Sequence, residues 1–278
     1  MEKKTKKRID PASESWDLFT KTGEISYYML YKKLTKKWDK MEEKLNGIVL
    51  SAINYGENDK ILSIFTLEQG IISAIIKGVK KASAKLKFAS EPFRFAEFVF
   101  SVSTTRRVVI NASLIDSFYQ IREDIVSFYA GATILEFIKK IQRENIISSE
   151  LFLETIESLK QITYAKESNA SALVKFLLNS LATVGYGLSV KGCFSCHTTI
   201  ENRIFFDCFS GAFFCEDCAQ KEFREIKYDT YLSLKRVAEG EIIEKEEAYF
   251  ALKLLEFYLE NKVEIKLTAL DELIKIIK

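Results

Sequence analysis

The sequence predicts an α+β protein of several domains, in which a small five-stranded barrel precedes an all-helical domain with a four-cysteine insert. Three observations support this prediction. Short segments rich in Ile, Val and Phe follow one another over residues 45–115, apolar residues then recur at helical steps, and four cysteines form two close pairs. Because 278 residues suffice for two or three cores, we expect an N-terminal extension at 1–44, the barrel at 45–115 and the helical domain at 116–278.

The barrel prediction depends on five β-rich segments and on the polar turns between them. A long, lysine-bearing segment, residues 78–91, separates the third strand from the fourth. A five-stranded oligonucleotide-binding (OB) fold has its one long connection at this place, so we expect an OB-fold barrel. The expected strands are residues 45–53, 59–66, 71–77, 93–102 and 106–114.

Helical periodicity begins near residue 117 and is interrupted only by the cysteine segment. The N-terminal extension is expected to form two short helices, separated by a break at Thr22-Gly23. Its side chains Ile25, Tyr28, Met29 and Tyr31 can dock on a partner or on the barrel. The remaining helices are expected near residues 149–165, 170–185, 230–239, 245–260 and 268–277.

Two Cys-x-x-Cys pairs, Cys193 with Cys196 and Cys215 with Cys218, are separated by eighteen residues. This spacing is typical of a tetrathiolate zinc site, which holds structure because it leaves no open coordination position. Between the pairs, residues 203–214 predict two aromatic strands around a Ser-Gly turn. We therefore expect a zinc-ribbon-like insert at residues 191–219 with one structural Zn²⁺ per chain.

Other roles for the sulfur and imidazole groups remain alternatives. Disulfides need an oxidising compartment, but the basic N-terminus is followed by polar residues and not by the apolar run of a secretory signal. His197 follows Cys196 directly and is an alternative ligand, although four thiolates already complete the shell. Cys208 lies among phenylalanines and is expected to be a buried apolar residue.

The basic residues are unevenly distributed along a chain whose formal net charge is only +2. Residues 71–110 contain eight basic and two acidic side chains, which predicts one positive face. Tyr55, Phe88 and Phe93 are candidate base-stacking residues, although core packing competes for the phenylalanines. A solvated loop that only aids solubility is the alternative. The candidate DNA-binding residues are Lys77, Lys80, Lys81, Lys85, Lys87, Arg106 and Arg107.

Several classes of function are disfavoured. The chain has no Walker motif, no Gly-x-Gly-x-x-Gly, no nucleophile elbow and only one histidine, so we expect a protein that is not an enzyme. No apolar run approaches the length of about 20 residues that spans a bilayer, so we expect a cytoplasmic protein without a membrane partner. An adaptor that binds protein through its zinc ribbon, without direct DNA binding, remains an alternative.

Short segments from both expected domains resemble, in order, the RecO family of bacterial recombination mediators. The barrel carries Gly-Ile-Val-Leu at 47–50 and Lys-Gly-Val-Lys-Lys at 77–81, and the helical domain carries Gly-Tyr-Gly at 185–187. The basic loop departs from the family in having neither arginine nor proline, and Glu91 stands where glutamine commonly precedes Pro-Phe. The other similar segments are residues 55–62, 65–66, 70–72, 92–93, 176–178 and 210–211, with the two cysteine pairs.

The resemblance implies a non-enzymatic DNA repair and recombination protein, cytoplasmic and associated with the nucleoid. Such a protein binds single-stranded and double-stranded DNA, anneals complementary strands and assists the loading of RecA. The implied partners are RecR and the C-terminal tail of single-strand-binding protein, with RecA engaged indirectly. Residues 15–32 resemble the short YqzL-like protein of Gram-positive bacteria, which suggests a fused N-terminal extension.

Overall fold

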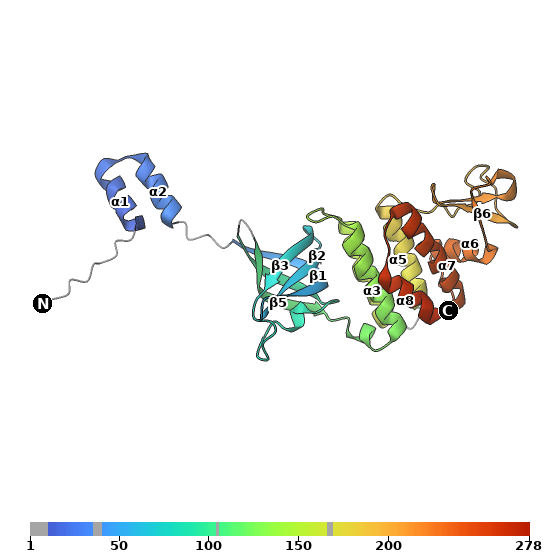
Figure 1. Cartoon of the computed structure of the whole chain (residues 1–278), viewed down its shortest axis with the longest axis horizontal. Helices are drawn as coiled ribbons and strands as arrows, with labels where there is room; N and C mark the ends of the chain where they lie inside the picture. Colours follow the sequence, from blue (N-terminus) through green and yellow to red (C-terminus); the bar gives the residue numbers. More distant parts are fainter. Residues whose placement is uncertain (1–10, 36–40, 104–105, 166–168) are drawn as a thin grey trace.

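The computed structural model describes residues 11–35, 41–103, 106–165 and 169–278. A closed barrel lies against a bundle of helices, and the cysteine insert lies at the end of the bundle remote from the barrel (Figure 1). This arrangement confirms the predicted fold class. Parts of the expected extension, residues 1–10 and 36–40, and of the turn at 103–105 lie outside the described residues. None of the described helices is long and apolar enough to cross a membrane.

The barrel is OB-like, with its strands in the order β1-β2-β3-β5-β4. One long strand makes closure possible, because residues 41–48 of β1 pair with β4 and residues 47–55 pair with β2. Gly47 lies where the two pairings overlap, and a Cβ there would meet Ile64 Cγ2 at 2.6 Å. The strands are β1 (Met41–Tyr55), β2 (Asp59–Thr66), β3 (Gly70–Ile76), β4 (Phe95–Val102) and β5 (Arg107–Asp116).

Two strand boundaries differ from the prediction. The first strand begins at Met41, so residues assigned to the extension belong to the barrel sheet. The fourth begins at Phe95 and not at residue 93, because Phe93 has a left-handed φ of 70°. The Phe93 amide donates to Val49 O at 3.1 Å, while its ring leaves the barrel and packs against Gly131 of the bundle.

The bundle confirms the predicted helices within a few residues. Its first helix begins at Ile125 and not near 117, because a 3-10 turn at Tyr119–Arg122 comes first and Asp124 caps the helix through the Ser127 amide at 2.7 Å. A capping box between Glu244 and Glu247 starts another helix, and a π-turn, Leu259–Val263, follows its end. The helices are α3 (Ile125–Ile141), α4 (Ser149–Tyr164), α5 (Asn169–Thr183), α6 (Tyr228–Ala238), α7 (Lys245–Tyr258) and α8 (Thr268–Ile277).

The insert contains the two expected strands, β6 (Ile204–Asp207) and β7 (Ala212–Cys215), joined by the Ser-Gly turn. A third strand, β8 (Arg224–Ile226), pairs with the other edge of β6. Sequence reasoning missed β8 because three residues with two charges carry no strand pattern. The insert is therefore a three-stranded sheet.

The buried apolar side chains of the described residues form two separate cores. One fills the barrel lumen and includes Phe98, Phe100 and Ile64, all fully buried. The other begins on the outer face of the barrel, at Ile48 and Phe65, and continues through the bundle into the insert. Barrel and bundle thus share apolar contacts, whereas the lumen belongs to the barrel alone.

The N-terminal hairpin confirms the two expected short helices, α1 (Pro11–Thr22) and α2 (Ile25–Thr35). The ring of Tyr31 lies 4.7 Å from that of Trp16, and the ring of Tyr28 lies 5.1 Å from that of Phe19. Ile25 is 71% exposed, and the tyrosines pack within the hairpin itself. Ile25 is therefore not docked on the barrel, and docking on a partner, the other alternative, stays a prediction.

Candidate metal centre and nucleic-acid interface

The four predicted zinc ligands come together. The thiols of Cys193, Cys196, Cys215 and Cys218 all lie within 4.8 Å of one another, and all five cysteines of the chain are free. The Sγ atoms of Cys196 and Cys215 are 3.7 Å apart. A tetrahedral zinc–thiolate centre with bonds of about 2.3 Å has an S–S edge of roughly 3.8 Å. The donor set and its dimensions therefore fit a tetrahedral metal ion.

Backbone contacts hold the first cysteine pair against the sheet. The Cys193 amide donates to Thr198 O at 2.9 Å, and the Phe194 amide donates to Phe213 O on β7 at 2.8 Å. The second pair follows β7 directly, so the β6–β7 hairpin delivers Cys215 to the first pair. Local turns and one hairpin are thus sufficient to assemble the centre.

Thiol ionisation also favours a cation at this position. Hydrogen bonding by the Thr198 hydroxyl, 3.0 Å from Cys196 Sγ, lowers the pKa of Cys196 to about 6. The neighbouring Cys215 and Cys196 thiols raise the pKa of Cys218 to about 12. Four adjacent thiolates repel one another because their charges are alike, and a divalent cation at their centre would offset this repulsion.

The alternative ligand and the fifth cysteine lie outside the centre. His197 occupies the knuckle between the pairs with a φ of 61° and is not among the clustered metal-binding side chains of the described residues. Cys208 is half-buried against the bundle core, and burial raises the pKa of its thiol. Its environment agrees with the apolar role expected from the sequence.

The lysine-bearing loop between β3 and β4 is anchored to the barrel by its backbone. The Gly78 amide donates to Asp59 Oδ1 at 2.8 Å, and the Lys80 amide donates to Asn58 O at 3.1 Å. Val79 and Ala89 are buried in the lumen core. The loop therefore has a defined course while its lysine side chains point to solvent.

All five predicted loop lysines are exposed, and none forms an ion pair with a described residue. Among the described residues, the Lys80 ammonium donates to the Gly56 carbonyl alone, at 3.5 Å, beside the β1–β2 turn. Because these charges have no carboxylate partner, phosphate groups can engage them without breaking an existing pair. The lysines are Lys77, Lys80, Lys81, Lys85 and Lys87.

The two predicted arginines differ. Arg106 is exposed, and no ion pair involves it within the described residues. Arg107 is half-buried, with its Nε 3.2 Å from Glu43 Oε2 and a terminal nitrogen 2.7 Å from Gln69 Oε1. This pairing counts against Arg107 as a phosphate ligand. It could not be predicted from the sequence, because Glu43 lies 64 residues away.

The three candidate base-stacking residues also differ in how exposed their side chains are. Tyr55 is 51% exposed and adjoins the Gly56 carbonyl that Lys80 reaches, so it lies beside the basic loop. Phe88 is half-buried under the loop, and Phe93 is 3% exposed. Of the three, only Tyr55 offers a largely open ring to a base.

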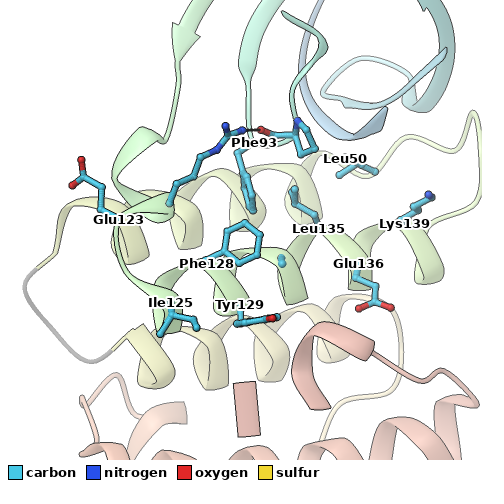
Figure 2. Close-up of a pocket in the computed structure, with 12 residues that line it drawn as sticks. Leu50, Phe93, Glu123, Ile125, Phe128, Tyr129, Leu135, Glu136 and Lys139 are labelled. Carbon is cyan, nitrogen blue, oxygen red and sulfur yellow. Dashed lines mark hydrogen bonds between the residues drawn. The ribbon is translucent and has the colours of Figure 1, made fainter. Parts of the chain in front are cut away.

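A cleft of about 920 Å³, not anticipated from the sequence, lies where the barrel meets α3. Figure 2 shows Phe93 pointing toward Phe128, with Ile125 and Tyr129 on α3 nearby and Lys139 at the other end of the cleft. Lys139 Nζ donates to Ser51 Oγ at 3.1 Å and therefore bridges α3 and β1. The cleft is mainly apolar with charged groups at its ends.

Glu91 clamps the two parts together beside this cleft. Its carboxylate lies 2.6 Å from an Arg94 nitrogen and 3.3 Å from an Arg122 nitrogen, and Arg94 also donates to Ser117 O at 2.8 Å. Burial alone would raise the pKa of Glu91, but the hydrogen bonds and charges of the two arginines lower it. The residue that departs from the usual glutamine thus forms a structural ion pair.

Fold and site together define a class of two-part proteins, in which an OB-like barrel carries a basic loop and a helical bundle carries a four-thiol insert. Two family models match this chain: "Recombination protein O N terminal" at residues 41–118 and "Recombination protein O C terminal" at residues 122–271. The chain belongs to the RecO family, which confirms that resemblance, whereas the YqzL-like resemblance of residues 15–32 stays a prediction.

The similarity to curated relatives extends over most of the chain. The DNA repair protein RecO of Acetivibrio thermocellus is 26% identical over 239 residues, or 84% of this chain and 88% of that protein. The DNA repair protein RecO of Bacillus subtilis is 26% identical over 232 residues, or 80% and 89%. The similarity thus covers both the barrel and the bundle.

Proposed function

We propose that this chain is a DNA-binding recombination mediator in DNA repair, acting by binding and not by catalysis. It binds single-stranded and double-stranded DNA, anneals complementary strands and, with RecR, helps RecA to load onto DNA covered by single-strand-binding protein. Family membership and the DNA repair names of its relatives support this role. The observation that carries DNA binding is the set of five exposed, unpaired lysines on a loop anchored to the barrel.

The same proposal includes one structural Zn²⁺ held by Cys193, Cys196, Cys215 and Cys218, and a site of action on the nucleoid in the cytoplasm. The 3.7 Å separation of two of the thiols supports zinc, because it matches the edge of a tetrathiolate tetrahedron. When bound, the ion would hold the insert together, leaving DNA binding to the barrel loop and its neighbours.

Fluorescence anisotropy with labelled single-stranded DNA across a salt series tests the DNA site. Each neutralised phosphate contributes about 0.7 to the slope of log K against log salt, so we expect a wild-type slope of magnitude roughly 2 to 4. Replacing Lys80, Lys81 and Lys85 by Ala should lower the slope by up to about 2, with thermal stability unchanged. A matched control replaces three exposed lysines of the bundle, Lys160, Lys275 and Lys278. An unchanged slope in the loop variant would exclude the loop as the DNA site.

For the tail of single-strand-binding protein, we propose the cleft between barrel and α3. Its apolar walls can bind the phenylalanine side chain at the end of the tail. Lys139 forms no ion pair with a described carboxylate, so its ammonium can bind the C-terminal carboxylate of the tail. Calorimetry with the full chain and a tail peptide should show binding that Phe128→Glu weakens at least about tenfold. Leu153→Glu, at a 60% exposed position on α4, is the control. Equal binding by both variants would exclude the cleft.

The adaptor alternative is favoured by one observation, the 52% exposed ring of Phe194 on the insert. Binding of single-stranded DNA distinguishes the recombination mediator from the adaptor. A chain that binds the tail peptide but no single-stranded DNA at physiological salt is an adaptor.

A further inference from the structure

Three cations of the helical domain lie over aromatic rings where the insert meets α7. The Arg224 guanidinium carbon is 4.5 Å from the centre of the Phe257 ring, and Lys227 Nζ is 4.5 Å from the centre of Phe250. Lys262 Nζ is 4.0 Å from the centre of Phe209. We call these six residues the cation–aromatic seam. Figure 1 shows β6, α6 and α7 together at the end of the bundle remote from the barrel.

The seam is continuous in the fold. Phe250 and Phe257 are two turns apart on one face of α7, and Lys262 follows in the π-turn. Arg224 on β8 pairs across the sheet with Phe206, three residues before Phe209 at the hairpin turn. A groove of about 380 Å³ runs along this surface and is lined by Arg224, Lys227, Phe250 and Phe257.

The three carboxylates that line this groove are already paired, whereas Asp229 and Glu246, in the neighbouring hollow beside Lys227, form no ion pair with a described residue. Glu225 accepts from Arg203 at 2.8 Å, Glu256 from Lys253 at 2.7 Å, and Glu260 lies 3.5 Å from Lys266. In contrast, no ion pair among the described residues involves Arg224, Lys227 or Lys262. The unpaired charge within the groove is therefore positive, although the surrounding segment is acidic overall.

Phe209 stands at the turn of the hairpin and is 80% exposed. Asp207 fixes this turn, because its carboxylate accepts from the Phe209 amide and from the Ser210 amide, each at 3.0 Å. An 80% exposed ring with an ammonium over one face resembles the stacking platforms that hold unpaired bases.

We propose that the cation–aromatic seam is a second binding site for single-stranded DNA, in which Arg224, Lys227 and Lys262 contact phosphates and Phe209 stacks on a base. This inference rests on the proposed function, in which the barrel loop holds the first strand. Single-stranded DNA fits better than a duplex, because paired bases cannot present a face to Phe209. Two strand sites at opposite ends of the bundle would let one molecule hold both strands that it anneals.

The test uses the full chain with Phe209→Ala, Lys227→Gln and Lys262→Gln combined. Phe209 and Lys227 are exposed and Lys262 is half-buried, and Lys227 lies at the α6 N-terminus, where a positive charge is unfavourable. We therefore expect at most a small change in the melting temperature. In anisotropy with labelled oligo(dT), we expect roughly tenfold weaker binding and a salt slope lower by about 1.4. Leu153→Ala, Lys160→Gln and Lys278→Gln form the matched control. Oligo(dT) containing 5-iodouracil should crosslink to Phe209 in the wild type.

Each outcome is decisive. If the barrel-loop variant loses affinity while the seam variant binds like its control, the seam is excluded and the proposed function stands. If the wild type binds no single-stranded DNA, the proposed function and the seam both fail. If the seam variant loses binding of a poly-glutamate peptide but keeps binding of oligo(dT), the seam recognises acidic protein segments and the inference is wrong.

Discussion

The barrel and the cysteine insert are both small β structures, but they are stabilised in different ways. The barrel closes its hydrogen-bond ladder through β3 and β5 and fills its lumen with buried side chains such as Phe98. The insert has strands of four, four and three residues, and its buried rings pack outward, Phe206 onto Tyr258 and Phe213 onto Tyr231. A sheet that cannot enclose a core needs crosslinks or a neighbour. The insert has a neighbour in the bundle, and its four clustered thiols could bind a metal ion.

The largest expected effect is loss of the metal. Structural zinc contributes on the order of 10 kcal/mol to the folding of such sites, so Cys193→Ser or chelation should unfold the insert and destabilise the bundle that shares its core. Hydrogen exchange should show that the lumen strands stay protected. Cys208→Ser, outside the cluster, is the control. Metal analysis that finds no zinc in protein purified without chelator would contradict this prediction.

Removing a side chain from the barrel lumen should have the opposite result, destabilising the barrel and leaving the insert folded. Phe98 is fully buried, so Phe98→Ala should lower the free energy of unfolding of the barrel by about 3 to 5 kcal/mol. Denaturant unfolding measures the change, and Ile53→Ala, at a 59% exposed position of β1, should cost less than about 0.5 kcal/mol. Equal loss of protection in the insert would show that the two regions are not separately stabilised.

The smallest effect concerns the clamp between the barrel and the bundle. Glu91→Gln removes the charged partner of Arg94 and Arg122 and should cost about 1 to 2 kcal/mol, a value reduced by solvent screening because Glu91 is 34% exposed. Glu97→Gln on β4 is the control, since the ion pair of Glu97 among the described residues is an exposed one with Lys44 at 4.0 Å.

The pH dependence of this clamp has a definite sign. The folded-state pKa of Glu91 is below the usual value of 4.5, so its contribution to stability is present above pH 4.5 and is lost as the pH falls through the folded-state pKa. The difference in stability between wild type and Glu91→Gln should therefore be constant near neutral pH and shrink in acid. A difference that grows in acid would contradict the ion pair.

Features that depend on neighbouring residues could be predicted from the sequence. The Cys-x-x-Cys spacing placed four thiols within reach of one ion, and the β-rich segments located the strands of the barrel. The helix expected near residues 245–260 begins at Lys245, as the local pattern predicted. These predictions succeeded because each depends on a turn, a period or a cap, whose geometry is set by a few adjacent residues.

The sequence by itself determined the barrel, the helices, the cysteine ligand set and the family, because local spacing and order encode them. Only the tertiary structure decided that Arg107 pairs with Glu43, that Glu91 clamps Arg94 and Arg122, and that the cleft and the seam exist. These features join residues far apart in the chain. Their contacts depend on how separately formed elements pack, and no local pattern records that packing.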